Sequence, residues 1–412
     1  MGSTHTLLTP TMIAKESLMR LKNNLVMGAR VHRAYEVEFR GSPKKGSSVT
    51  IRKPVKFKVT TGRTRSTSTI SEDSITLTVS YQKHVSWAFN TADLTLTIEE
   101  YNERYVMGGT QALANEIDCD LTVLYKDIYN EVWESTGFVS PNTFMVLGKA
   151  GQRMDEEAVP RTDRCIVFNP AAHWSMANAL SGKQTPALAD KATRLGYLGN
   201  IANFDLYMDQ NIKVHTNGDF HDTGSTAAIL VATTGGGTGT SIELIHFRKV
   251  STVALKQGDV FTVAGVFAVN PITGESTGSL REFVVTADAS CAATATSAIV
   301  SAYISPEMID TGPYKTVDTL PAAGAAVSIV GTQGEPYPVN LAFHKNCFAL
   351  VMVPLVVPHN VWGASASDSG FSIRILKAYD VNTDDEICRL DVLYGTKTLY
   401  PELGCRIRGA EG

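Results

Sequence analysis

The longest helical pattern in the chain runs from Thr110 to Glu134. Apolar side chains recur there at steps of three or four, which places them on one face of a helix. These side chains belong to Leu113, Ile117, Leu121, Leu124, Ile128 and Val132. Thr110 can cap the start of this helix, and Gly137 follows its end. The pattern predicts one long helix that backs a sheet, although any amphipathic core helix would show the same pattern.

A two-residue alternation precedes this helix and predicts strands. Apolar side chains occupy odd positions in residues 49–59 and again in 75–89, with mostly polar side chains between them. Residues 60–74 are rich in Thr, Ser and Arg, which is typical of the loop at the tip of a hairpin. A turn and a short helix are expected over 93–107, and Gly108-Gly109 should separate them from the long helix.

The formal net charge is only −4, yet positive charge is concentrated in the predicted hairpin. No acidic residue lies between Glu38 and Glu72, whereas the same stretch holds nine basic residues. They are Arg40, Lys44, Lys45, Arg52, Lys53, Lys56, Lys58, Arg63 and Arg65. A two-stranded hairpin is at best marginally stable alone in water. We therefore expect the hairpin to lie against another surface.

The long helix offers an acidic surface that could receive this basic hairpin, in the same subunit or in a neighbouring one. Its candidate contact residues are Glu116, Asp120, Asp127 and Glu131. Three interpretations of the hairpin remain open: a protein–protein arm, a solvated charged face and a nucleic-acid contact. Stacking on nucleic-acid bases would require interleaved aromatic residues. Only Phe57 lies among the charges, so we favour the protein–protein arm.

Composition indicates a soluble protein of two or three domains, because the 412 residues are 43% hydrophobic and 19% charged. The six cysteines are widely spaced and form no C-x-x-C pair, which favours a reduced, intracellular protein. No signal peptide is visible. The most apolar run, residues 347–358, is too short to span a bilayer, so no membrane contact is expected.

Three motifs suggest chemistry but lack its context. Residues 274–278 match the G-x-S-x-G pattern of esterases, yet no helix is predicted after them, so a hairpin turn is expected. The glycine-rich residues 235–240 lack the lysine of a phosphate-binding loop. Asp155-Glu156-Glu157 is an acidic run typical of a solvated face. We expect no catalytic residue, no cofactor and no metal, and hence no enzyme.

The N-terminal segment and residues 218–338 each differ in composition from the rest of the chain. A helix should begin near Thr9-Pro10 and form a basic arm that docks on another surface, because Glu16 is the only acid in the first 35 residues. Residues 218–338 are rich in Gly, Ala, Thr and Ser, with short strand-like runs around the turn at 270–274. This composition is typical of a small antiparallel barrel.

Several spaced segments resemble the coat proteins of Salmonella-type short-tailed bacteriophages. They cover most of the first 130 residues in the family's order, and three more lie nearer the C-terminus. The segments are 9–10, 24–26, 49–54, 84–85, 93–96, 103–105, 112–118, 163–170, 388–395 and 400–402. No single segment would identify the family, but their occurrence together in this order does.

The resemblance implies an α+β fold, the major capsid protein fold of tailed phages, with an inserted antiparallel β-barrel. Its first parts would be an N-terminal arm (1–34), an extended hairpin loop with strands of the peripheral domain (35–92), and the peripheral domain with a spine helix at 110–134 (93–158). The first part of the axial domain (159–217), the inserted barrel (218–338), and the second part of the axial domain with a returning peripheral strand (339–412) would follow.

The resemblance further implies a structural protein that self-assembles as pentamers and hexamers into an icosahedral shell around phage double-stranded DNA. Its implied partners are other copies of itself, a scaffolding protein, a portal protein at one vertex and DNA bound without sequence-specific contact. Its implied location is the virion capsid, after assembly in the host bacterial cytoplasm. The alternative function is a nucleic-acid-binding module that uses the basic hairpin 40–65.

Overall fold

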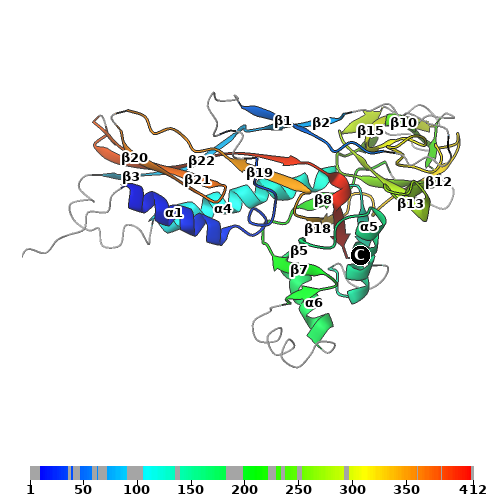
Figure 1. Ribbon diagram of the computed structural model, residues 1–412, viewed down its shortest axis with the longest axis horizontal. Coiled ribbons are helices and arrows are strands. Elements are labelled where there is room, and N and C mark those ends of the chain that lie inside the picture. The colour runs from blue at the N-terminus through cyan, green and yellow to red at the C-terminus, as the bar shows by residue number, and fades with distance from the viewer. Residues whose placement is uncertain are drawn as a thin grey trace, which may run out of the picture. The chain divides into compact units, whose positions relative to one another are not determined.

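The chain forms two compact units, each built from segments that are far apart in sequence (Figure 1). The first comprises Met1–Lys53, Ser74–Leu121 and Phe348–Leu399, and the second comprises Pro54–Asp73, Thr122–Cys347 and Tyr400–Gly412. The computed structural model describes residues 10–35, 39, 47–57, 63, 72–90, 105–134, 140–181, 198–220, 229–232, 237–247, 253–291, 297–359, 361–381 and 383–409. The domain limits given above remain predictions.

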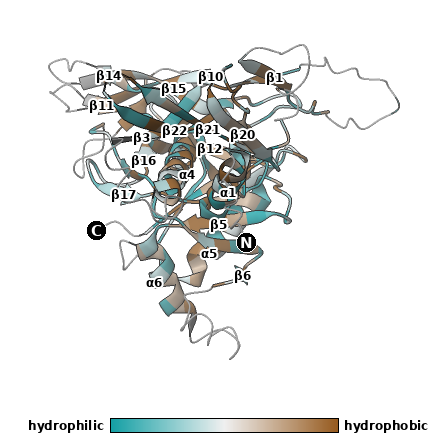
Figure 2. Ribbon diagram, turned by 90° about the vertical axis from the view of Figure 1, so that its left-hand side faces the viewer, coloured by the Kyte–Doolittle hydropathy of each residue, from teal (hydrophilic) through white to brown (hydrophobic). Residues whose placement is uncertain are grey.

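An antiparallel sheet forms the frame of the first unit. Its strands are β19 (Phe348–Met352), β22 (Asp385–Thr398), β21 (Phe371–Asp380) and β20 (Trp362–Asp368), and β3 (Tyr81–Asn90) pairs with the other edge of β22. The helices α1 (Pro10–Asn24) and α4 (Met107–Thr122) lie on the same face of this sheet (Figures 1 and 2). Both helices bury an apolar stripe against the strands. The stripe residues are Ile13, Leu18, Leu21, Leu113, Ile117 and Leu121.

Gly108 and Gly109 lie in the first turn of α4 and do not separate it from a preceding helix, which corrects the sequence-based prediction. A Cβ atom on Gly109 would lie 3.1 Å from Leu390 Cδ1 and 3.3 Å from the Trp87 ring. Gly109 therefore allows the helix to approach the sheet closely. The expected turn and short helix at 93–107 fall mostly outside the described residues.

The long helix is shorter than the prediction of Thr110 to Glu134. After Thr122 the backbone tightens into a 3₁₀ turn, η2 (Val123–Asp127), and Ile128 is already extended. Residues Glu131–Trp133 form the strand β4. Ile128 and Val132 are buried as the apolar stripe requires, but an even spacing also suits one face of a strand. Pairing of β4 with β23 outweighs the helical pattern here.

The predicted hairpin is present as β1 (Ser48–Arg52) and β2 (Ser74–Thr78), which pair antiparallel with Ile51 opposite Ile75. Tyr394 on β22 reaches α4, so the next residue, Gly395, faces away from the helices. A Cβ atom on Gly395 would lie 2.2 Å from the Thr78 carbonyl oxygen. The base of the hairpin therefore packs on the face of the sheet opposite α4.

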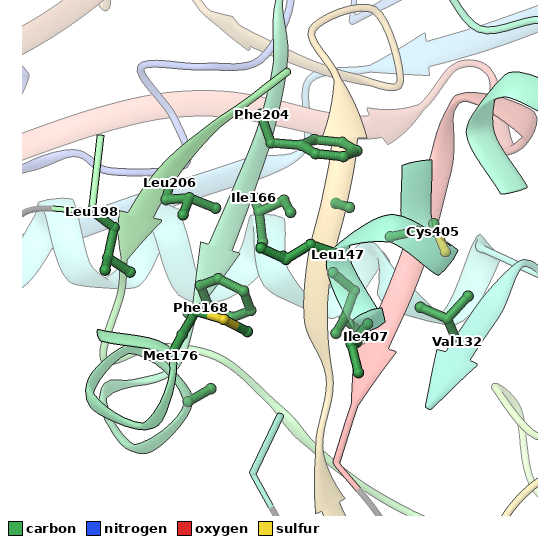
Figure 3. Packing of buried hydrophobic residues seen from close by; sticks show 14 of the residues in the cluster. Val132, Leu147, Ile166, Phe168, Met176, Leu198, Phe204, Leu206, Cys405 and Ile407 are labelled. Carbon is green, nitrogen blue, oxygen red and sulfur yellow. The ribbon is translucent and has the colours of Figure 1, made fainter. Parts of the chain in front are cut away.

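The second unit contains a mixed sheet in the order β4-β23-β18-β5-β7-β6. The remaining bounds are β5 (Arg164–Phe168), β6 (Asn200–Ile201), β7 (Phe204–Met208), β18 (Asn340–His344) and β23 (Gly404–Arg408). Apolar side chains from this sheet meet those of α5 (Phe144–Glu156) and α6 (Pro170–Ser181) in one core, shown in Figure 3. Ile166, Phe168 and Phe204 are fully buried there.

The same unit contains a closed antiparallel barrel with strand order β10-β15-β13-β12-β16-β9, which confirms the predicted inserted barrel. Its strands are β9 (Ile229–Val231), β10 (Gly237–Phe247), β12 (Val260–Val269), β13 (Ser276–Val285), β15 (Ser297–Met308) and β16 (Ala326–Ile329). The barrel has its own apolar core around Phe261, Phe283 and Val300. Two short ladders flank it, β11 (Val253–Leu255) with β14 (Ala289–Cys291) and β8 (Val214–Thr216) with β17 (Pro336–Pro338).

Candidate assembly surfaces

The basic hairpin exposes those of its charges that the structure describes. Arg52, Lys56 and Arg63 are exposed, and Lys53 is half-buried. The other predicted contact residues lie outside the described residues: Arg40, Lys44, Lys45, Lys58 and Arg65. The apolar side of the hairpin is buried, since Leu77 is fully covered and Ile51 nearly so. Within β1 the exposed Arg52 follows the buried Ile51, so this strand of the hairpin is amphipathic.

Two of the predicted acidic residues, Glu116 and Asp120, lie on the sheet-facing flank of α4. Lys83 Nζ lies 2.7 Å from Glu116 Oε1 and 3.7 Å from Asp120 Oδ2, and Tyr394 Oη donates to Asp120 Oδ2 at 2.6 Å. The hydrogen bond to Glu116 raises the pKa of Lys83. Burial, followed by the bond to Asp120, raises the pKa of Tyr394. Both carboxylates therefore already have partners within their own unit.

The other two acidic residues do not lie on the surface of this helix, which corrects the prediction. Asp127 ends the 3₁₀ turn and is half-buried. Glu131 lies in β4, is 1% exposed, and sits directly opposite Arg406 of β23. Its Oε1 is 2.8 Å from Arg408 Nε. Glu131 is therefore a buried structural charge and cannot receive the hairpin of a neighbour.

The helix α1 docks on strands of its own unit. Ile13, Leu18 and Leu21 are buried, and Lys22 Nζ lies 2.6 Å from Asp368 Oδ2 at the end of β20. Beyond the helix, Asp118 of α4 accepts hydrogen bonds from the amides of Val26 at 2.7 Å and Gly28 at 2.8 Å. The basic arm is therefore fixed to both the sheet and α4.

A cluster of buried charges joins the barrel to α5, and the sequence-based reasoning missed it. Arg281 and Glu282 are neighbours on β13, and each is 3% exposed. Arg281 pairs with Glu157 at the end of α5. Glu282 accepts a hydrogen bond from Arg153 Nη2 at 2.9 Å and another from the Glu131 amide at 2.7 Å.

Further buried polar groups surround this contact. Arg406 donates from Nη1 to the Gly258 carbonyl at 2.6 Å and lies over the Tyr125 ring. His215 is held between the Tyr125 hydroxyl and an Asp259 carboxylate oxygen, each 2.9 Å from a ring nitrogen. Buried polar groups are tolerated when they are paired in this way. The barrel is thus joined to its neighbouring sheet by polar contacts as well as apolar ones.

Burial has the largest effect on the pKa of the two carboxylates at this contact. It raises the pKa of Glu282 to about 7, although Arg153 and the Glu131 amide act in the opposite direction. Burial also raises the pKa of Glu157 despite the nearby Arg281 guanidinium. Both shifts have the same physical cause, because burial disfavours the charged form of a carboxyl group.

Charges inside otherwise apolar strands were the available sequence signal for this cluster. Arg281 and Glu282 precede Phe283-Val284-Val285, and Arg406 and Arg408 flank Ile407. Their partners lie far away in sequence: 129 positions separate Arg153 from Glu282, and 148 separate Gly258 from Arg406. Because spacing alone cannot identify such distant partners, the pairing was not predictable without the fold.

The motifs considered for chemistry have structural roles among the described residues. Ser276 begins β13, and its Oγ accepts a hydrogen bond from the Gly278 amide at 3.3 Å. The carboxylates of Asp155, Glu156 and Glu157 each contact an arginine. Within the described ranges no group of three or more His, Cys, Asp or Glu residues could hold a metal ion. No helix in that part of the chain is long and apolar enough to cross a membrane.

Comparisons with known proteins give the class and then the family. The sequence model described as "P22 coat protein - gene protein 5" matches residues 3–409. The protein is therefore a bacteriophage coat protein, a structural component of a capsid shell. The chain belongs to the P22 coat protein family.

One relative and several solved structures are similar to this chain. A "Major capsid protein" of Acyrthosiphon pisum secondary endosymbiont phage 1 is 34% identical over 96 residues, which is 23% of each chain. The structure of Mycobacterium phage Che8 has a TM-score of 0.47 and 15% identity, and covers 93% of this chain and 90% of that one. The capsid of Ralstonia phage GP4 has a TM-score of 0.46 and 8% identity, and covers 90% and 85%.

Proposed function

We propose that this chain is a major capsid protein whose copies assemble as pentamers and hexamers into an icosahedral shell around phage double-stranded DNA. The observation that carries the proposal is the family match over residues 3–409. A scaffolding protein during assembly in the host cytoplasm and a portal protein at one vertex would be its further partners. The alternative, a nucleic-acid-binding module, has no support from the family match.

The basic hairpin would act as the arm that reaches a neighbouring copy. Its exposed residues Arg52, Lys56 and Arg63 give it a positively charged surface. An arm of this kind stabilises a shell through many weak contacts that add up around the lattice. Charge of one sign on the arm mainly sets the rate and the register of encounter, and apolar burial provides most of the stability.

We expect charge reversal on the hairpin to slow assembly without unfolding the subunit. The test variant is Arg52→Glu, Lys56→Glu and Lys58→Glu combined. Because steering by charge changes association rates by roughly 10- to 1000-fold, assembly followed by light scattering should slow by about tenfold or more at low salt. Added salt should reduce the difference between this variant and the wild type, since it screens exposed charges.

A matched variant reverses three exposed lysines elsewhere, Lys256, Lys345 and Lys397, and has the same net charge. It should assemble close to the wild-type rate, and circular dichroism should show both variants folded. Equal rates for the hairpin variant and the wild type would exclude the electrostatic role of the arm. Absence of shells from the wild-type protein, even with its scaffolding protein present, would contradict the proposed function itself.

A further inference from the structure

Two loops of the barrel form a platform, which comprises residues 270–275 after β12 and residues 309–316 after β15. The Oδ1 atom of Asn270 accepts two amide hydrogens within the first loop, at 2.9 and 3.3 Å. The Oγ1 atom of Thr316 accepts an amide hydrogen from the start of the second loop at 3.0 Å. Lys315 Nζ joins the two loops, because it donates to a carbonyl oxygen of the first loop at 3.3 Å. The platform therefore has a fixed shape of its own.

The basic hairpin contacts this platform at Lys56 and Phe57. The segment Pro54–Asp73 belongs to the same compact unit as the barrel. The Lys56 amide donates to the Tyr314 hydroxyl at 3.3 Å, and Phe57 lines a groove that both loops of the platform also line. Phe57 is 70% exposed and Ile272 of the first loop is 80% exposed, so both lie at the rim of the groove. The contact is therefore light, and most of the Phe57 surface stays free.

The groove has an excess of negative charge, which suits a basic segment. Among the described residues that line it, Glu275 and Asp310 are acidic and Lys315 is the only base. Lys315 already pairs with Asp318 at 3.2 Å. The basic hairpin supplies the opposite charge. Complementary charge of this kind fixes the register of a contact more than it adds to the affinity.

The end of α5 extends this acidic surface. Asn270 Nδ2 donates to the Glu156 carbonyl at 3.4 Å, so the platform lies against the last turn of the helix. Burial raises the pKa of the Glu157 carboxyl group, whereas the positive charges of Arg281 and Lys56 act to lower it. Lys56 is therefore close enough to Glu157 to interact with it. The carboxyl end of a helix favours positive charge, which adds to this attraction.

We propose that the platform and the end of α5 dock the basic hairpin of the same subunit, so that the inserted barrel sets the course of the arm. This inference rests on the proposed role of the hairpin as an arm that reaches a neighbouring copy. A segment that is ordered before it binds loses less conformational freedom on binding, and its contact becomes tighter. The barrel therefore promotes assembly by holding the arm of its own subunit.

Hydrogen exchange of the unassembled full-length subunit tests the docking. Tyr314→Phe removes the acceptor hydroxyl and keeps the ring. Exchange of the Lys56 amide, measured on peptides that overlap residues 54–57, should rise roughly two- to tenfold, the range expected for the loss of one hydrogen bond. Tyr303→Phe, which alters an exposed tyrosine of β15 in the same barrel, should leave this exchange unchanged. Wild-type exchange in Tyr314→Phe, or an equal rise in Tyr303→Phe, would overturn the proposal.

Two surface substitutions test the remaining contacts without relying on Tyr314. Ile272→Ser removes an exposed apolar side chain from the rim of the groove, and Lys56→Gln removes the charge that acts on Glu157. Each should raise exchange in residues 54–57, after correction for the intrinsic rate. Arg63→Gln removes an exposed charge farther along the hairpin and should not. Unchanged exchange in either Ile272→Ser or Lys56→Gln would contradict the docking.

Assembly rates test the role of the platform. Tyr314→Phe should assemble at least about twofold more slowly than the wild type, because its arm must become ordered during binding. Added salt should not remove this difference, since the lost hydroxyl group carries no charge. Tyr303→Phe should assemble at the wild-type rate. An equal or faster rate for Tyr314→Phe would show that the platform does not promote assembly. Absence of wild-type shells would instead contradict the proposed function and would leave the exchange results unaffected.

Discussion

At the scale of single residues, Asp118 has the clearest structural role in the first unit. It lies on α4, is 1% exposed, and accepts the amide hydrogens of Val26 and Gly28. Without the Asp118 carboxylate, these two amide groups in the segment after α1 would lose their hydrogen-bond acceptors. A buried donor that loses its acceptor costs free energy of the order of its desolvation. One carboxylate thus ties the basic arm to the spine of its unit.

We predict that Asp118→Ala lowers the free energy of unfolding by about 2–6 kcal/mol, because it removes the acceptor of two largely buried amides at about 1–3 kcal/mol each. Urea unfolding of the unassembled subunit, followed by circular dichroism, measures the loss. Glu116→Ala, two positions earlier on the same helix, removes only the partly exposed pair with Lys83 and should change the free energy by at most about 1 kcal/mol. Similar losses in the two variants would contradict this role of Asp118.

At the scale of elements, local pattern predicted much of the structure and failed where two patterns coincided. The alternation in residues 49–51 and 75–77 correctly gave the hairpin, and the turn at 270–274 correctly lies between two barrel strands. Ile128 and Val132 fit both a helix and a strand, and pairing with β23 decided the outcome. For that reason the predicted position of Glu131, on the surface of the long helix, was wrong. The ion pairs of Arg281 with Glu157 and of Glu282 with Arg153 could not be predicted from the sequence, because the partners are distant from one another in the chain.

The packing of β2 on β22 gives a test at this scale. Gly395→Ala should lower the free energy of unfolding by about 1–3 kcal/mol or more, because its new Cβ atom would lie 2.2 Å from the Thr78 carbonyl oxygen and the hairpin base must move. Hydrogen exchange in β1 and β2 should increase. Gly148→Ala is the matched substitution on α5, where nothing lies within 4 Å of the new atom. It should instead stabilise the helix by about 0.5–1 kcal/mol. Unchanged exchange in the hairpin of Gly395→Ala would show that the two strands do not pack.

At the scale of the whole molecule, the second unit holds two large apolar cores that share no residue among those described, and a smaller buried cluster of Tyr129, Val260, Val284 and Val330 is separate from both. One large core lies inside the barrel around Phe283, and the other lies between the mixed sheet, α5 and α6 around Phe168. Polar contacts such as those of Glu282 and Arg406 join the two regions. Separate cores of this kind are expected to open as separate cooperative units.

We therefore predict local effects from core truncation. Phe283→Ala should cost about 3–5 kcal/mol within the barrel, because it removes a fully buried aromatic side chain. Hydrogen-exchange protection should fall in β12 and β13 and persist in β5 and β18. Phe168→Ala is the matched variant and should produce the reverse pattern. Equal loss of protection in both regions from either variant would show that the two cores fold as one.

The ladder between β8 and β17 has a consequence for how such a chain could change over time. Thr216 pairs with Pro336 and Val214 with Pro338, so the polypeptide leaves for the barrel and returns from it on adjacent, hydrogen-bonded strands. Paired strands lie only about 5 Å apart. Removal of everything between them would leave a gap that a short turn can bridge. This ladder is therefore a natural site for domain insertion. An ancestral subunit could have gained a domain here, or an engineered subunit could carry a foreign one, without rearrangement of the flanking strands.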